Sequence, residues 1–385
     1  MAPVGREPAA ERPDASPAPR AVVLRALGLG DLLTAVPALR GLRRALPGHR
    51  IELAAPAALA PLAALSGAVD ETVAVPSLVT LPDPVPPLPA RLHGAEVAVN
   101  LHGAGPQSHE LLRATRPRRL MAFACGPFPD GPAWDPDEHE VERWCRLLGA
   151  HGVPCDPHDL LLPRPEGRGG GGSRSGGGSR DGGGSRSGGG SRDGGRGGGG
   201  HAAGGEGAGS GEHAARGAVV LHPGAASGAR RWPVERFAAV ARALTAAGER
   251  VLLTGSPAEA GLAAELARRA DLPDGACLAG RTDVLGLATV VADAACVVAG
   301  DTGVAHLATA MGTPSVLLFG PTPPTAWGPL IGRDPDAPRH LVLWAGRTGD
   351  PHADAPDPGL LEITPQAVLD GVRRVRATGP ARRDG

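Results

Sequence analysis

Four loops carry the residues whose types and spacing indicate chemistry, and the first contains Gly28, Gly30 and Asp31. The two glycines let a ligand or another backbone segment approach closely. A carboxylate beside such a loop is suited to general-base catalysis. The alternative is structural, with Asp31 as the N-cap of the following helix and its carboxylate accepting backbone N–H groups. The spacing alone leaves both interpretations open.

The second loop contains Asp301, Thr302 and Gly303, directly after the apolar run 295–299. A helix that begins there presents free N–H groups and the positive end of its dipole, which favours an anion such as phosphate. Thr302 adds a hydroxyl, and Gly303 permits close approach. A capped turn without a ligand is the alternative. His306 lies one turn further on and is equally consistent with a structural role.

The third loop covers residues 222–226 and is followed by Arg230 and Arg231. Two guanidinium groups at the start of a helix match the oxygens of a diphosphate. Gly224 lies within this loop and is expected to face a cleft. Glu259 follows the next apolar run, where an acid either binds a sugar hydroxyl or occupies the first turn of a helix.

The fourth loop contains Gly320 in a tight turn after another apolar run, and it is expected to face the same cleft or to be only a structural turn. The patterns at 135–137 and 334–336 match Asp-x-Asp, which holds a metal in one class of glycosyltransferases. Both lie in proline-rich loops rather than after a strand. We therefore predict no metal site and no cofactor.

The elements that position these loops alternate between strands and helices. In the first half we predict strands over 21–26, 51–55, 71–75, 97–101 and 119–122 with helices over 32–46, 57–65 and 138–151. In the second half we predict strands over 218–222, 250–254, 276–278, 295–299 and 315–319. The intervening helices cover 258–269, 284–292 and 304–311, after a first one that carries Phe237, Val240, Ala241 and Leu244 at helical spacing. Such repeats predict parallel sheets covered on both faces.

The chain therefore divides into an α/β pair of Rossmann-like domains with a cleft between them. We predict a disordered tail over 1–20, a first domain over 21–166, a linker over 167–216 and a second domain over 217–362. Half of the linker residues are glycine, and GGGSRSGGGSRD occurs twice in tandem, which indicates a disordered tether. A last helix over 363–378, with Thr364 as N-cap and Pro365 after it, is expected to pack back on the first domain.

Composition limits the partners. The net charge is −1 over 385 residues, which argues against binding nucleic acid through global charge. Five cysteines without a Cys-x-x-Cys pair indicate neither a disulfide framework nor a zinc site. Residues 1–20 lack the apolar core of a signal peptide, and prolines interrupt the apolar stretch 53–69. We expect a cytoplasmic protein and leave peripheral contact at the inner face of the membrane open.

These motifs, in this order, resemble glycosyltransferase family 9, the ADP-heptose:lipopolysaccharide heptosyltransferases and their relatives. The resemblance runs over about 21–165 and 217–330 and rests on the four loops together with the stretches 230–233 and 327–329. It implies a GT-B fold, a nucleotide-sugar donor held mainly by the second domain, and metal-independent inverting transfer to a glycan or lipid-linked acceptor.

The resemblance also implies roles for individual residues. Asp31 matches the family's proposed base, Arg230 stands where many members carry a phosphate-binding Lys, and Glu259 stands where an acid binds the ribose. The turn at Thr302 and Gly303 matches the phosphate-binding turn. Alternatives are a non-catalytic nucleotide-sugar-binding protein and a nicotinamide oxidoreductase, for which Leu33 breaks the glycine pattern. The arginines at 113, 116, 118 and 119 suggest an anionic acceptor or a solvated surface.

Overall fold

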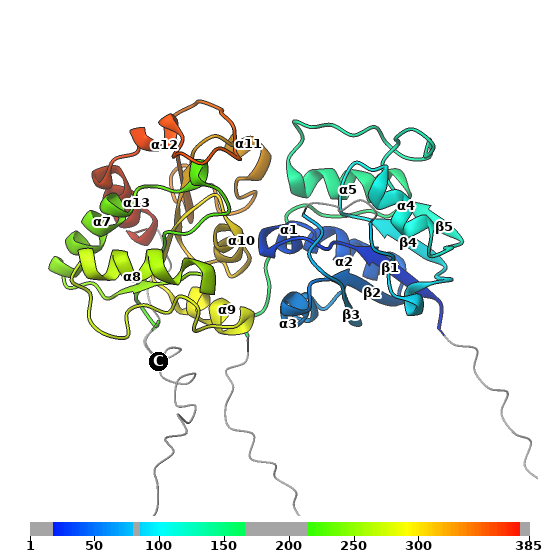
Figure 1. Cartoon of the computed structure of the whole chain (residues 1–385), viewed down its shortest axis with the longest axis horizontal. Coiled ribbons are helices and arrows are strands. Elements are labelled where there is room, and N and C mark those ends of the chain that lie inside the picture. The colour runs from blue at the N-terminus through cyan, green and yellow to red at the C-terminus, as the bar shows by residue number, and fades with distance from the viewer. Residues whose placement is uncertain (1–17, 80–84, 166–214, 378–385) are drawn as a thin grey trace, which may run out of the picture.

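Two α/β domains lie side by side in the computed structural model, which describes residues 18–79, 85–165 and 215–377 (Figure 1). Residues 1–17 of the predicted tail and almost all of the predicted linker lie outside the described residues, and Arg20, which was assigned to the tail, begins the first strand. The first domain, blue to cyan in Figure 1, adjoins the second through helices near the middle of the molecule. No helix among the described residues is long and apolar enough to cross a membrane.

The first domain is built on a parallel sheet with the strand order β3-β2-β1-β4-β5. Its strands are β1 (Arg20–Leu24), β2 (Arg50–Ala55), β3 (Glu71–Ala74), β4 (Val97–Asn100) and β5 (Arg119–Met121). Its helices are α1 (Leu29–Thr34), α2 (Val36–Ala45), α3 (Ala60–Leu65), α4 (Gln107–Arg113) and α5 (Glu140–Ala150). Strand β4 is buried over its whole length and β1 over all but its first residue, as their apolar runs require when helices cover both faces.

The second domain repeats this plan with the strand order β10-β9-β8-β6-β7. Its strands are β6 (Val219–His222), β7 (Val251–Leu253), β8 (Cys296–Gly300), β9 (Ser315–Phe319) and β10 (His340–Trp344). Its helices are α7 (Val234–Ala246), α8 (Ala260–Arg269), α9 (Val284–Asp293), α10 (Gly303–Ala310), α11 (Pro324–Trp327), α12 (Pro358–Glu362) and α13 (Pro365–Ala377). The predicted α/β class and the GT-B pairing of two such domains are confirmed.

Three local predictions were wrong. The helix predicted over 32–46 is two helices, since Pro37 has no N–H to continue the ladder of α1 into α2. The strand predicted over 276–278 is a single bridge pair between Leu253 and Cys277 at the edge of the sheet. Strand β10, which pairs with β9 over its whole length, was not predicted.

The last helix begins where predicted but packs elsewhere. The hydroxyl of Thr364 accepts a hydrogen bond from the Ala367 N–H (3.2 Å) at the start of α13. The apolar face of α13, formed by Val368, Val372 and Val375, packs against the second sheet rather than on the first domain. The expected return to the first domain is therefore wrong, because these valines complete the core of their own domain.

Candidate active site

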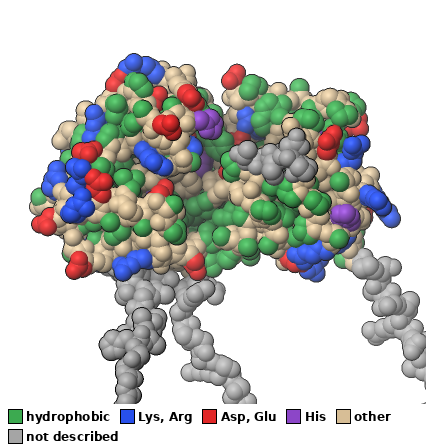
Figure 2. Space-filling view, viewed as in Figure 1, with side chains coloured by type: hydrophobic (Ala, Val, Ile, Leu, Met, Phe, Trp, Pro, Cys, Tyr) green, Lys and Arg blue, Asp and Glu red, His purple; other side chains and the backbone are tan. Residues whose placement is uncertain are grey.

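The strand orders explain why the predicted loops converge. In an open parallel sheet, ligands bind beyond the carboxyl ends of the strands, where the direction of chain winding reverses. In the first domain this point lies between β1 and β4, and in the second between β6 and β8. The Asp31 loop follows β1, and the Asp301 loop follows β8. On the face shown in Figure 2 the surface is hollowed between the domains, with histidine and acidic side chains along the edge.

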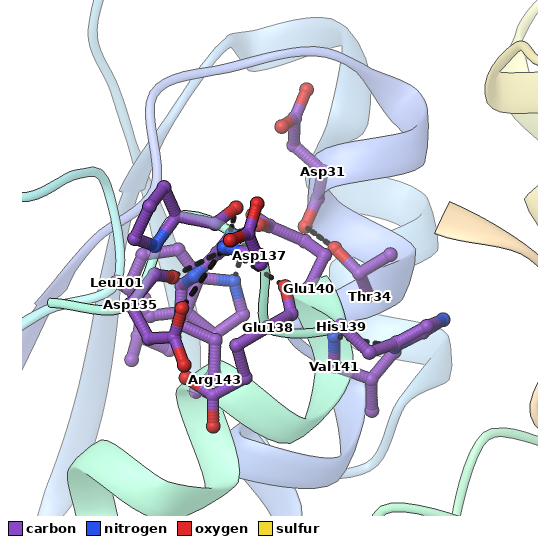
Figure 3. A network of polar contacts seen from close by, with 12 residues as sticks. Asp31, Thr34, Leu101, Asp135, Asp137, Glu138, His139, Glu140, Val141 and Arg143 are labelled. Atoms are coloured by element: carbon purple, nitrogen blue, oxygen red, sulfur yellow. Dashed lines mark hydrogen bonds and ion pairs between the residues drawn. The ribbon is translucent and has the colours of Figure 1, made fainter. Parts of the chain in front are cut away.

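Asp31 lies at the third position of α1 rather than at its N-cap. Its Oδ2 accepts a hydrogen bond from the Gly28 N–H (3.1 Å), so Gly28 is the cap and Asp31 reaches back to it. Its Oδ1 lies 3.3 Å from Nη2 of Arg25. The side chain remains 28% exposed, which leaves the carboxylate open toward solvent (Figure 3). The capping contact and access to a substrate coexist at this residue.

The start of α1 and the start of α10 lie against each other across the domain boundary. A Cβ added to Gly30 would come within 2.8 Å of Cδ2 of His306, and one added to Gly303 within 2.9 Å of Cβ of Leu29. Larger residues at either glycine would force the helices apart. Gly303, predicted to admit a ligand, therefore also admits the first domain. We call this contact between the starts of α1 and α10 the seam. Asp31 and His306 both lie beside it, because Asp31 follows Gly30 and His306 faces Gly30.

A cluster in the second domain combines the predicted donor-binding residues. Arg230, at the end of the short turn η3 (Gly228–Arg230), places Nη1 3.7 Å from Oδ2 of buried Asp301 and 3.5 Å from its backbone oxygen. Nε of Arg230 and Oγ1 of Thr302 are buried atoms without hydrogen-bond partners among the described residues. A guanidinium and a hydroxyl that are only partly satisfied, beside a helix start, form a suitable set of donors for an anion.

The charges in this cluster influence each other. Burial raises the pKa of Asp301, while His306, Arg230 and a hydrogen bond with Thr322 act in the opposite direction. Burial also lowers the pKa of His306, although Asp301 counteracts it. His306 is therefore a neutral imidazole at neutral pH, and its ring packs edge-on against Trp327 with 5.8 Å between centroids.

The remaining predicted residues occupy other places around the second domain. Glu259 accepts a hydrogen bond from the Ser256 N–H (2.7 Å) and lies against Gly224, where a Cβ would overlap its carboxylate. Arg231 is exposed, and its Nε donates to the Ala225 carbonyl (3.0 Å) rather than to the Asp301 cluster. Gly320 packs beneath α12, since a Cβ there would lie 3.2 Å from Cβ of Leu360.

Sequence reasoning missed a buried ionic network behind Asp31 (Figure 3). Arg25, the first residue after β1, is 1% exposed and pairs with Glu140 at 2.9 Å. Glu140 also pairs with Arg143 and accepts a hydrogen bond from Nε1 of Trp144 (3.0 Å). The signal available in the sequence was a charged residue that interrupts the apolar run 21–26, since an arginine there can be buried only with a partner.

His139 links this network to the second domain. Its Nδ1 accepts a hydrogen bond from the Val141 N–H (3.2 Å), so its Nε2 carries the proton and donates to the Gly328 carbonyl (2.8 Å). Burial lowers the pKa of His139 below its ordinary value, although the Gly328 contact and nearby carboxylates raise it. The neutral tautomer therefore makes one hydrogen bond inside the first domain and one to the second domain.

Two other sets of charged residues noted in the sequence lie outside the Asp301 cluster. Arg118 and Arg119 line a groove of about 420 Å³ with His49 and His151, at the edge where β4 and β5 begin. This is the edge opposite to Asp31, because β5 runs parallel to β4 and β1. In the Asp-x-Asp stretches, Oδ1 of Asp135 and of Asp334 each accepts the N–H two residues on. The described residues contain no group of three or more potential metal ligands.

Comparison with known proteins agrees with the geometry. The sequence pattern described as "Glycosyltransferase family 9 (heptosyltransferase)" matches residues 201–337. The resemblance to glycosyltransferase family 9 seen in the sequence is therefore confirmed over this range. The matched range includes the Arg230 cluster, Glu259 and the Thr302–Gly303 turn.

Individual relatives match this chain over 40% to 94% of its length. Lipooligosaccharide heptosyltransferase 2 of Haemophilus influenzae is 32% identical over 166 residues, which are 40% of this chain and 46% of that relative. The chain thus spans about half the length of this relative. Among solved structures, E. coli ADP-heptose LPS heptosyltransferase II has a TM-score of 0.64 at 20% identity, with 94% and 100% of the two chains covered. A family 9 glycosyltransferase from Veillonella parvula has a TM-score of 0.67 at 18% identity, with 94% and 98% covered.

Proposed function

We propose that this chain is a metal-independent, inverting glycosyltransferase of family 9. In this proposal it transfers a heptose or a related sugar from a nucleotide-sugar donor, ADP-linked by analogy with the relatives, to a hydroxyl group of a glycan or glycolipid. The proposal includes a cytoplasmic location, with peripheral contact at the inner face of the membrane when the acceptor is lipid-linked.

One juxtaposition carries the proposal. A partly exposed carboxylate held at the start of α1 lies across the seam from the start of α10, where Thr302 and Arg230 have polar atoms without a partner among the described residues. The seam thus has two walls: the start of α1 with its base, and the start of α10 with Arg230, Thr302 and their anion-binding donors. A base and a set of anion donors on opposite walls suit transfer of a sugar from a diphosphate to an acceptor hydroxyl. The relatives' names add that E. coli heptosyltransferase II uses ADP-heptose, which suggests the donor class.

In the proposed mechanism the two walls of the seam have different roles. Asp31 takes the proton of the acceptor hydroxyl as its oxygen attacks the anomeric carbon, opposite to the diphosphate. The bond to the diphosphate breaks, and the negative charge that develops there is stabilised by Arg230 and the N–H groups at the start of α10. These groups are fixed before the reaction, so little reorganisation is needed at the transition state.

A donor screen followed by a turnover assay tests the proposal. ADP-heptose should raise the melting temperature of the protein more than UDP-glucose or GDP-mannose does, because a ligand that binds the native state stabilises it by mass action. With a bacterial envelope glycolipid added, ADP release should accelerate. Absence of a thermal shift with all three nucleotide sugars would refute donor binding. A shift without ADP release would favour the non-catalytic binding protein.

A further inference from the structure

We propose that Arg25 is a positioning residue for Asp31, held in place by Glu140, and that it sets the direction of the Asp31 carboxylate toward the seam. This inference rests on the proposed function, in which Asp31 takes a proton from the acceptor. Arg25 itself is 1% exposed and therefore closed to a substrate, so its effect on the reaction is transmitted through Asp31.

Arg25 holds Asp31 at both its backbone and its side chain. Nε donates to the Asp31 carbonyl (2.8 Å), and Nη2 lies 3.3 Å from Oδ1. Nη2 also donates to Oγ1 of Thr34 (3.1 Å), which in turn donates to the Asp31 carbonyl (3.0 Å). With Oδ2 accepting the Gly28 N–H, each carboxylate oxygen has one fixed partner. A planar guanidinium with several donors suits this geometry, whereas an ammonium group does not.

The other side of Arg25 is fixed by residues far away in the chain. Nη1 donates to the Leu101 carbonyl (2.5 Å), Nη2 pairs with Glu140 (2.9 Å), and the guanidinium stacks 4.7 Å from the centroid of Trp144. Burial raises the pKa of Glu140, but the charges of Arg25 and Arg143 and the hydrogen bonds from Arg25 and Trp144 outweigh it and hold the pKa below its ordinary value. Glu140 is thus a carboxylate at neutral pH.

Stability alone is a weak reason for this arrangement. A buried ion pair often contributes little net stability, because desolvation of both charges offsets their attraction. A fixed direction for the reacting carboxylate is a different gain, since small misplacements of a catalytic group lower its rate strongly. His139, the neighbour of Glu140, donates a hydrogen bond to the Gly328 carbonyl, so the network that supports Asp31 is also connected to the second domain.

Arg143 provides a matched control. It is buried like Arg25, pairs with the same Glu140 and stacks over Trp134 at 4.3 Å. It has no contact with Asp31 among the contacts that the structure records; its other hydrogen bonds go to the carbonyls of residues 135, 136 and 138. A purely structural role of the network would make Arg25→Lys and Arg143→Lys equivalent.

The test measures ADP release from ADP-heptose, with a bacterial envelope glycolipid as acceptor, for Arg25→Lys and Arg143→Lys in the wild-type and Asp31→Asn backgrounds. Rates are normalised to the folded fraction, determined by ADP titration calorimetry. We expect Arg25→Lys to lower kcat by ~10-fold or more, with the KM for ADP-heptose within about twofold of wild type. Arg143→Lys should lower kcat by less than about threefold, and Arg25→Lys should have little further effect once Asp31 is Asn.

The outcomes separate the two hypotheses. Equal losses in Arg25→Lys and Arg143→Lys, or an Arg25→Lys loss that persists in the Asp31→Asn background, overturn the positioning role. Wild-type turnover in Asp31→Asn removes the proposed base, and with it the role of Arg25. Should Arg25→Lys fail to fold, Thr34→Val replaces it, because it removes the hydroxyl that joins Arg25 to the Asp31 carbonyl. Unchanged kcat in Thr34→Val would then count against the proposal.

Discussion

Arg25 and Arg230 lie near the carboxyl ends of the central strands of the two sheets, yet their surroundings differ. All three nitrogens of Arg25 have partners within the first domain, and the side chain is 1% exposed. Arg230 is 25% exposed and contacts Asp301 at 3.5 and 3.7 Å, and its Nε has no partner within the described part of the chain. A guanidinium whose N–H donors all have hydrogen-bond partners can fix a neighbouring group, whereas one with a donor left over can bind a ligand. The start of α1 is therefore suited to positioning a reacting group, and the start of α10 to binding one.

Replacing the base should give the largest effect on activity. Asp31→Asn keeps an oxygen of nearly the same shape for the Gly28 N–H, so the fold should persist. The amide cannot accept the acceptor's proton, and we expect turnover to fall by ~10²-fold or more. ADP affinity should stay near wild type, since the donors lie on the other wall. ADP release and calorimetry measure the two quantities, and near-normal turnover would leave Asp31 with only its capping contact.

Removing Arg230 should weaken ADP binding instead of slowing the reaction step. Arg230→Ala deletes a charged donor beside Asp301, and we expect ADP affinity to fall by ~1.5–3 kcal/mol in binding free energy. Arg242→Ala is the control, because Arg242 is an exposed arginine of α7 whose side chain, within the described residues, donates its hydrogen bond to the Arg269 carbonyl. Titration calorimetry with ADP compares the two variants. Equal affinities would take Arg230 out of the donor site.

The contact between the walls should be sensitive to a single methyl group. In Gly303→Ala the new Cβ would lie 2.9 Å from Cβ of Leu29, and we expect a loss of ~1–3 kcal/mol in the free energy of unfolding from overpacking. Gly261→Ala in α8 is the matched control, because no atom lies within 4 Å of its Cβ position. Denaturant unfolding measures both. A Gly303→Ala protein as stable as the control would mean that the helices separate easily.

The His139 contact predicts a pH dependence of stability. Its pKa is lower in the folded protein than in the unfolded chain, so protonation favours unfolding. The stability linked to His139 is present above the ordinary histidine pKa of ~6.5 and is lost as the pH falls through the folded value. In His139→Gln, which keeps a donor for Gly328, the decrease in melting temperature between pH 7.5 and 5 should be smaller than in wild type. An identical decrease would assign the effect to other buried histidines.

The smallest effect is expected at the far edge of the first sheet. Arg118 lies beside the groove opposite to Asp31, and Arg116 precedes it in the same exposed segment. Charge reversal in Arg116→Glu/Arg118→Glu should therefore leave ADP release with the glycolipid acceptor within about twofold of wild type at low salt, where exposed charges act most strongly. A tenfold loss would instead indicate that an anionic part of the acceptor reaches this edge.

Much of the architecture followed from local patterns. The apolar runs and glycine-rich loops predicted most strands and placed Asp31, Thr302 and Arg230 at strand ends, because parallel strands buried on both faces leave an unmistakable run of apolar residues. The edge elements were harder to predict. Strand β10 and the bridge at Cys277 depend on pairing with a neighbour, which local sequence does not specify. The position of α13 likewise depended on which sheet its valines could cover.

The sequence by itself determined the two-domain α/β class, the loops at the seam and the resemblance to family 9. Only the tertiary structure decided how those loops are used. It showed that the Asp31 carboxylate accepts the N–H of Gly28, the N-cap of α1. It also showed that α1 and α10 pack closely at Gly30 and Gly303, and that the counter-ion of Arg25 is Glu140, 115 residues away. The physical reason is that a buried charge and a close helix contact each require a partner in space. The spacing of residues along the chain does not name that partner.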